Sequence, residues 1–94
     1  METMNKIEIP QYVLFGINIL KKNNFEAFLV GGCVRDYLLD KIPKDWDITT
    51  NANPEEIIKV FNQENIKTLY ENDFGTVAVF IDENILEVTT YRVE

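Results

Sequence analysis

The chain has 94 residues, of which 46% are hydrophobic and 27% are charged, a composition typical of one small globular domain. Its formal net charge of -7 argues against a surface built mainly to bind nucleic acid, because such surfaces neutralise phosphates with lysine and arginine. A single cysteine excludes an internal disulfide, and the lack of histidine excludes the usual zinc clusters and histidine-based triads. Any metal site must therefore use oxygen ligands.

The first predicted element is a helix from Pro10 to about Asn23. Its apolar residues recur at helical spacing: Val13, Leu14, Ile17 and Leu20. Proline suits a first helical turn, and Lys21 and Lys22 suit the negative end of the helix. The N-terminus lacks a signal-peptide pattern, and the chain has no window of 18 apolar residues, so a cytoplasmic location is expected.

A glycine pair separates a short strand from a second helix. The apolar run from Ala27 to Val30 is typical of a buried strand, and Gly31 and Gly32 interrupt it. A helix is expected from about Cys33 to Leu39, with Leu38 on its apolar side. A strand, a glycine pair and a helix can present backbone N–H groups to a phosphate, but a tight turn that binds nothing has the same pattern.

Arg35 is expected in the first turn of this second helix, where the helix dipole disfavours a cation. A nearby anion would explain the arginine. That anion is either a triphosphate or a local carboxylate such as Asp36.

Two aspartates alternate with apolar residues in the next predicted strand, which runs from Trp46 to Thr50. Alternate residues of a strand share a face, so Asp45 and Asp47 should face away from the core side, which carries Ile48. Two close carboxylates repel one another unless a cation lies between them, and Mg²⁺ prefers carboxylate and phosphate oxygens. The alternative interpretation is a solvated strand end.

The second half of the chain predicts one more helix and a β-hairpin. The helix should run from Pro54 to about Asn62, with the preceding asparagine as its N-cap. Residues 66–70 suggest a short strand. Residues 76–81 and 85–92 are rich in branched and aromatic side chains and should form the hairpin.

Glu87 lies among apolar neighbours in the last predicted strand. If that strand lies beside the one that carries Asp45 and Asp47, Glu87 completes a cluster of three carboxylates. The alternative is an exposed residue that pairs with a lysine or arginine on a neighbouring strand. The large aromatic side chains are expected in the core: Phe28, Trp46, Phe61, Phe74 and Phe80.

The chain resembles the N-terminal catalytic head of the bacterial tRNA nucleotidyltransferase (CCA-adding enzyme) and poly(A) polymerase family. The resemblance covers about residues 26–92 and rests on LVGGCVRDYLLDKIPKDWDITTNANPEEI and YENDFGTVAVFIDENILEVTTYR. It implies an α+β nucleotidyltransferase fold, in which a mixed, mostly antiparallel sheet is flanked by about three helices. It also implies Mg²⁺-dependent transfer of nucleotides from CTP and ATP to the 3′ end of tRNA, with release of pyrophosphate.

The resemblance also implies a role for each candidate residue. Asp45 and Asp47 correspond to the metal ligands, and Glu87 corresponds to a third catalytic acid. The triphosphate contacts are the glycine pair, Gly31 and Gly32, of which Gly32 is the closer match, together with Arg35.

Members of this family continue with an arginine-rich segment and helical neck, body and tail regions, which are not found in residues 1–94. We therefore expect a truncated, single-domain head that is inactive or weakly active alone. A poly(A) polymerase head is the alternative within the family. A hypothesis of a different class is a non-catalytic module that folds or forms a homodimer through an exposed sheet edge.

Overall fold

The computed structural model describes residues 9–41, 46–71 and 75–91. These residues form a five-stranded mixed sheet with three helices, in the order α1 (Gln11–Lys22), β1 (Ala27–Val30), α2 (Gly32–Leu38), β2 (Asp47–Thr50), α3 (Pro54–Asn62), β3 (Lys67–Tyr70), β4 (Thr76–Ile81) and β5 (Asn84–Thr90). The strand order across the sheet is β1-β2-β5-β4-β3. Only β2 and β5 are parallel, and the other neighbours are antiparallel. The expected α+β fold is confirmed.

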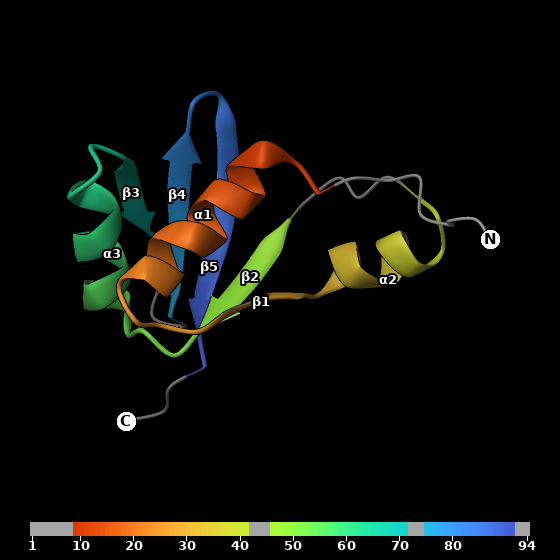
Figure 1. The fold of residues 1–94 in the computed structure, drawn as a ribbon, viewed down its shortest axis with the longest axis horizontal. Helices are drawn as coiled ribbons and strands as arrows, with labels where there is room; N and C mark the ends of the chain where they lie inside the picture. The colour runs from red at the N-terminus through yellow and green to blue at the C-terminus, as the bar shows by residue number, and fades with distance from the viewer. Residues whose placement is uncertain (1–8, 42–45, 72–74, 92–94) are drawn as a thin grey trace.

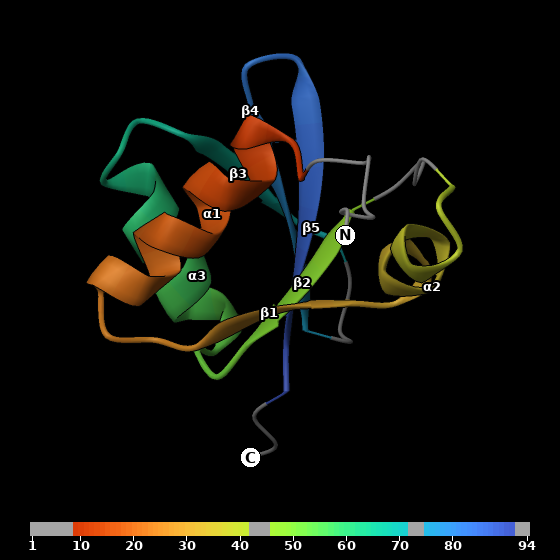
Figure 2. The same cartoon turned by 45° about the vertical axis from the view of Figure 1, so that its right-hand side comes forward.

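Helices α1 and α3 cover one face of the sheet (Figures 1 and 2). The core lies between this helical layer and the sheet, and its largest fully buried side chains are Phe61, Leu20, Ile48, Ile57 and Leu86. Gly16 of α1 is buried against β5, where an added Cβ would lie 2.5 Å from Cδ2 of Leu86. The close approach of α1 to the sheet therefore depends on the missing side chain.

Helix α3 begins with the predicted N-cap, Asn53, and Glu56 makes this cap reciprocal. The Asn53 side chain accepts a hydrogen bond from the backbone N–H of Glu56, at 2.8 Å, and the Glu56 carboxylate accepts one from the N–H of Asn53, at 2.9 Å. The predicted hairpin is also present, because β4 and β5 pair up to Ile81 and Asn84 with two residues between them.

Helix α2 extends away from the sheet and packs mainly against β1 (Figures 1 and 2). Leu38 is 76% exposed. The prediction that Leu38 lies on a buried apolar side is therefore wrong, because neither α1 nor α3 lies beside this helix to cover it.

One of the expected core aromatics lies at the surface. Phe28 is 53% exposed, because β1 turns it to the face of the sheet that the helices do not cover. Trp46 and Phe61 are buried as predicted, and Phe80 is half-buried. Phe74 lies outside the described residues.

Candidate functional site on the uncovered face of the sheet

The uncovered face carries two acidic residues side by side at the centre of the sheet. The parallel pairing of β2 with β5 places Asp47 in register with Glu87. The flanking strands add Val30 beside Asp47 and Ala78 beside Glu87. Asp45 lies outside the described residues, so its predicted place in the carboxylate cluster stays a prediction.

A cleft of about 350 Å³ opens at this pair and is lined by Trp46, Asp47, Glu71, Ile85 and Glu87. Sequence reasoning did not select Glu71, which follows the last residue of β3. Its only signal was an acidic residue beside a predicted turn. A larger cleft of about 470 Å³ lies between α1 and the end of β4, but the paired carboxylates are in the smaller one. We therefore assign the candidate site to the smaller cleft.

Burial raises the pKa of Glu87 above its ordinary value, and the negative charges of Glu71 and Asp47 raise it further. Protonated Glu87 also forms side-chain hydrogen bonds with these two carboxylates. The three side chains thus share one region of negative potential. A bound cation would relieve this repulsion, because it would favour the ionised form of Glu87.

The donor set fits a hard divalent cation in its chemistry, since Asp47 and Glu87 both offer carboxylate oxygens. Within residues 9–41, 46–71 and 75–91, no three acidic or cysteine side chains form a group that could hold a metal ion. The described residues therefore supply a pair of candidate ligands rather than a complete metal site.

Gly31 lies directly against the carboxylate of Asp47. Its φ of +83° is a conformation that side chains other than glycine rarely adopt, and an added Cβ would lie 3.2 Å from Oδ2 of Asp47. The glycine pair therefore leaves space beside the proposed metal ligand. Of the two glycines, only Gly31 has a backbone conformation that favours glycine.

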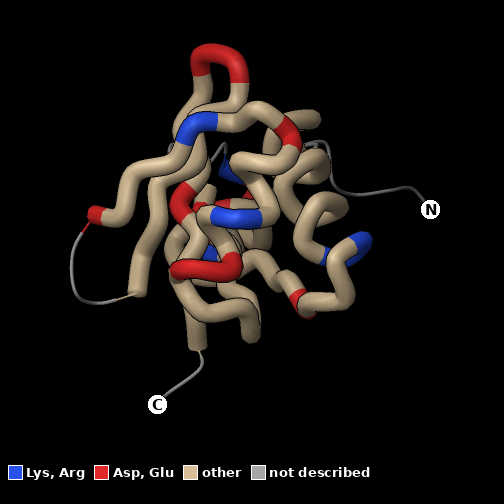
Figure 3. The backbone as a smooth tube through the Cα atoms, turned by 90° about the vertical axis from the view of Figure 1, so that its left-hand side faces the viewer, with Lys and Arg blue, Asp and Glu red and all other residues tan. Residues whose placement is uncertain are grey.

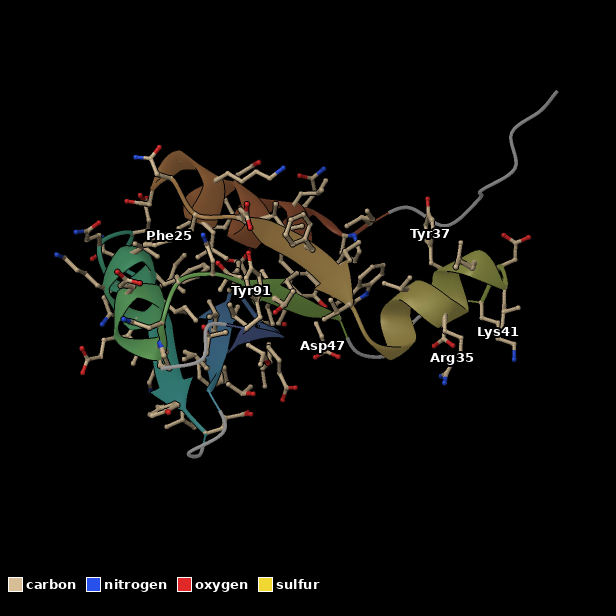
Figure 4. The ribbon with its side chains drawn as sticks, turned by 90° about the horizontal axis from the view of Figure 1, so that it is seen from below. Phe25, Arg35, Tyr37, Lys41, Asp47 and Tyr91 are labelled. Carbon is tan, nitrogen blue, oxygen red and sulfur yellow. The ribbon has the colours of Figure 1, made fainter. Side chains whose placement is uncertain are left out.

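Arg35 is the fourth residue of α2, so it belongs to the first turn, as predicted, and to the last turn as well. The helix has only seven residues, and the fourth already belongs to its final turn, where a cation is favourable. The guanidinium Nη2 lies 3.3 Å from Oδ1 of Asp36 and 3.4 Å from the position of a Cβ on Gly32. Arg35 and Asp47 project toward the same side of the molecule (Figure 4).

Threonine hydroxyls continue the uncovered face beyond the carboxylates. Oγ1 of Thr49 donates a hydrogen bond to the carbonyl oxygen of Thr89, at 2.9 Å, and the hydroxyls of Thr76 and Thr89 are 3.0 Å apart. These bonds link β2, β5 and β4 two residues beyond the pair formed by Asp47 and Glu87. They help to hold the strands that position the two acids.

Lysine and arginine are scattered along the chain rather than collected in one basic stretch in the view of Figure 3. The helices in the described part of the chain lack the length and hydropathy of a transmembrane segment. The scattered positions of lysine and arginine in this view agree with the net charge of -7.

Comparison with known proteins identifies poly(A) polymerases and CCA-adding enzymes as relatives. A family model described as the poly A polymerase head domain matches residues 27–94. The poly(A) polymerase I of Escherichia coli O6:H1 is 48% identical over 89 residues, which are 95% of this chain and 18% of that protein. The CCA-adding enzyme of Bacillus cytotoxicus is 44% identical over 78 residues, which are 83% of this chain and 19% of that protein.

Solved structures give the same result. The Bacillus stearothermophilus CCA-adding enzyme in complex with CTP matches with a TM-score of 0.77 and 39% identity, over 86% of this chain and 20% of that one. A tRNA nucleotidyltransferase complexed with a primer tRNA and an incoming ATP analogue matches with a TM-score of 0.65 and 32% identity, over 84% of this chain and 24% of that one. The chain spans about a fifth of the length of the relatives that it matches.

Proposed function

The chain belongs to the poly A polymerase head domain family, and from this premise we propose that it is the nucleotide-transferring head of a tRNA nucleotidyltransferase that adds CCA to tRNA 3′ ends. The observation that carries the proposal is the pairing of Asp47 with Glu87 in one cleft, with the glycine turn against Asp47. Such a site suits Mg²⁺-dependent transfer of a nucleotide from CTP or ATP.

Each group in this cleft has a role in the proposal. Asp47, with Asp45, would hold Mg²⁺, and Glu87 is the third acid. When bound, the cation would neutralise charge on the phosphates during transfer. The backbone at Gly31 and Gly32 leaves room for the triphosphate to approach closely, and Arg35 would exchange its contact with Asp36 for a phosphate oxygen.

A poly(A) polymerase head is the second candidate within the family. The specific observation in its favour is the group of similar poly(A) polymerase I sequences, of which the Escherichia coli protein matches this chain as well as the CCA-adding enzyme does. The two activities differ in nucleotide selection. We infer that the head alone does not select the nucleotide. The polar side chains that line the cleft of this chain are carboxylates, which we assign to the cation rather than to recognition of a base.

We also propose that the 94-residue chain forms a single domain and is weakly active or inactive alone. Its net charge leaves little basic surface for RNA, so most of the binding energy for a tRNA would come from elsewhere. The hypothesis of a self-associating module stays a prediction. In the described sheet, its strands β1 and β3 lie at the edges where such pairing would occur.

Titration of the chain with Mg²⁺ and ATP, followed by calorimetry, tests the proposed function. We expect binding that requires the cation and that is lost in Asp47→Asn. Glu83→Gln is the matched control, because it removes one negative charge from the exposed turn between β4 and β5. Binding that is equal in Asp47→Asn and the wild type would contradict the metal-dependent role of this cleft.

A further inference from the structure

Two exposed aromatic side chains lie on the same face of the sheet as the carboxylates. Phe28 of β1 is 53% exposed and lies in register with Thr49 of β2. Tyr91 is 44% exposed and follows β5, where its backbone N–H donates to the carbonyl oxygen of Thr50 and so extends the strand pairing. Strand alternation therefore turns Tyr91 to the same face as Glu87. We name Phe28 and Tyr91 the aromatic platform.

The ring of Tyr91 is held in place across the sheet. Its hydroxyl donates a hydrogen bond to the carboxylate of Glu26, which precedes β1, so the side chain spans β2. This bond raises the pKa of Tyr91 and keeps the hydroxyl protonated. Figure 4 shows the side chain of Tyr91 over the sheet, with Asp47 nearer α2. A fixed ring is a better stacking surface than a mobile one, since less rotamer freedom is lost on binding.

The aromatic platform and the glycine turn lie on opposite sides of Asp47 along the uncovered face. Gly31 is at the end of β1 nearest Asp47, whereas Phe28 lies on the other side of the row formed by Val30 and Asp47. In phosphoryl transfer the attacking and leaving oxygens lie roughly in line. If the triphosphate extends toward Gly31, the attacking hydroxyl must come from the side of the platform.

The platform suits a base rather than a phosphate. Aromatic rings stack on the faces of unpaired bases, and such stacking does not require a positive charge. Thr49 and Thr89 lie level with Phe28 and between Tyr91 and the carboxylates, and their hydroxyls can contact a ribose. The carboxylate of Glu26 disfavours a phosphate at this end of the face.

We propose that Phe28 and Tyr91 stack on the base of the 3′-terminal nucleotide of the RNA acceptor and thereby direct its 3′-hydroxyl toward Asp47. This inference rests on the proposed function, because it assumes that the triphosphate lies at the glycine turn. It assigns Phe28 and Tyr91 to acceptor positioning, and it assigns no catalytic step to them.

Nuclear magnetic resonance of the chain can separate the two proposals. One titration uses the ribotrinucleotide ApApA as an acceptor, and a second uses Mg²⁺ with a non-hydrolysable ATP analogue. We expect ApApA to shift the ring signals of Phe28 and Tyr91 upfield and the ATP analogue to shift the amide signals of Gly31 and Gly32. Phe15, which is 44% exposed, supplies the control signals, because it belongs to α1, which covers the opposite face of the sheet.

Variants then test the side chains. Phe28→Ala should weaken ApApA binding about tenfold, the usual effect of losing one stacked ring, while Phe28→Trp and Phe15→Ala should not weaken it. Tyr91→Phe keeps the ring but loses the hydrogen bond to Glu26 that holds it, so it should bind ApApA slightly more weakly than the wild type.

Three results would overturn the proposal. The first is an ATP analogue that shifts the platform signals when ApApA does not, because the platform would then hold the incoming base. The second is ApApA binding that is equal in Phe28→Ala and the wild type. In both cases the proposed function would stand if the glycine amides still respond. The third is the absence of all shifts with both ligands, which would also contradict the proposed function.

Discussion

Oδ2 of Asp47 lies 3.2 Å from the position that a Cβ on Gly31 would occupy. Asp47 belongs to β2, and Gly31 directly follows β1, whose last residue, Val30, pairs with Asp47. The glycine turn and the acidic strand are therefore one structural unit. A change at the glycine should act on the carboxylate.

Gly31→Ala should reduce both stability and cation-dependent nucleotide binding. The φ of +83° places a strained conformation on alanine, at a cost of about 1–3 kcal/mol, and the new methyl group would push Asp47 aside. Gly32→Ala is the matched control for stability, because the nearest neighbour of its added Cβ is the end of the Arg35 side chain, at 3.4 Å. Urea denaturation measures the stability of both variants, and calorimetry with Mg²⁺ and ATP measures nucleotide binding by Gly31→Ala. Equal losses of stability in both variants would contradict this distinction.

Glu87→Gln should stabilise the cation-free chain near neutral pH. Because the pKa of Glu87 is higher in the folded state than in the unfolded state, the folded state binds more protons between the two values. The free energy of unfolding therefore falls as the pH rises through this interval, and the loss is complete above the folded-state pKa. Glutamine has no such titration.

Urea denaturation in EDTA, at several pH values above and below 4.5, measures this effect. The variant should exceed the wild type in stability at neutral pH, and the difference should shrink as the pH falls below 4.5. Glu83→Gln, in the exposed turn, should show no such pH-dependent difference. A Glu87→Gln variant that is less stable than the wild type at neutral pH would show that burial of the charged carboxylate and its repulsion from Glu71 and Asp47 do not dominate at this position.

Local sequence patterns predicted most elements of this fold, because periodicity and capping act within short segments. Alternation placed Asp47 opposite the core side that carries Ile48, and the N-cap of α3 was predicted from Asn53. The sequence predicted that Asp47 and Glu87 lie close together only if their strands are neighbours. It could not show that they are, because the parallel pairing of β2 with β5 joins segments 40 residues apart. The resemblance to known enzymes supplied the fold that local patterns left open.

The errors concern properties that depend on neighbouring elements. The short apolar run around Phe28 predicts a core residue, but the burial of Phe28 depends on which face of the sheet the helices cover. Arg35 belongs to the last turn of α2 as well as to the first because this helix is only seven residues long, a length that the sequence did not define. Glu71 was missed because it follows a short edge strand, and only the fold brings that end of β3 to the cleft. Asp45 stays a prediction.

Thr49→Val should loosen the parallel pairing that aligns the two acids. The substitution removes the hydrogen bond from Oγ1 to the carbonyl oxygen of Thr89, and a bond of this kind contributes about 1 kcal/mol. Thr49→Ser keeps the hydroxyl and should retain most of that stability. Urea denaturation gives the free energy of unfolding, and amide exchange of Thr89 and its neighbours on β5 reports local opening. Unchanged exchange in Thr49→Val would show that the backbone ladder alone fixes this pairing.

Gly16→Ala should destabilise the fold without acting on the site directly. Alanine favours a helix by about 1 kcal/mol over glycine, so an exposed position would gain stability. At this buried position the new Cβ would lie 2.5 Å from Cδ2 of Leu86, a fully buried side chain, and such overpacking costs about 1–3 kcal/mol. The clash should therefore exceed or cancel the gain in helix propensity.

Asn18→Ala supplies the control for this substitution, because Asn18 is exposed on the same helix and should gain propensity without a clash. Thermal and urea denaturation of both variants should show a lower stability for Gly16→Ala and an equal or higher one for Asn18→Ala. Nucleotide binding by the folded fraction should be unchanged in both, because α1 lies on the face of the sheet opposite Asp47. A Gly16→Ala variant as stable as Asn18→Ala would mean that α1 can move away from β5 at no cost.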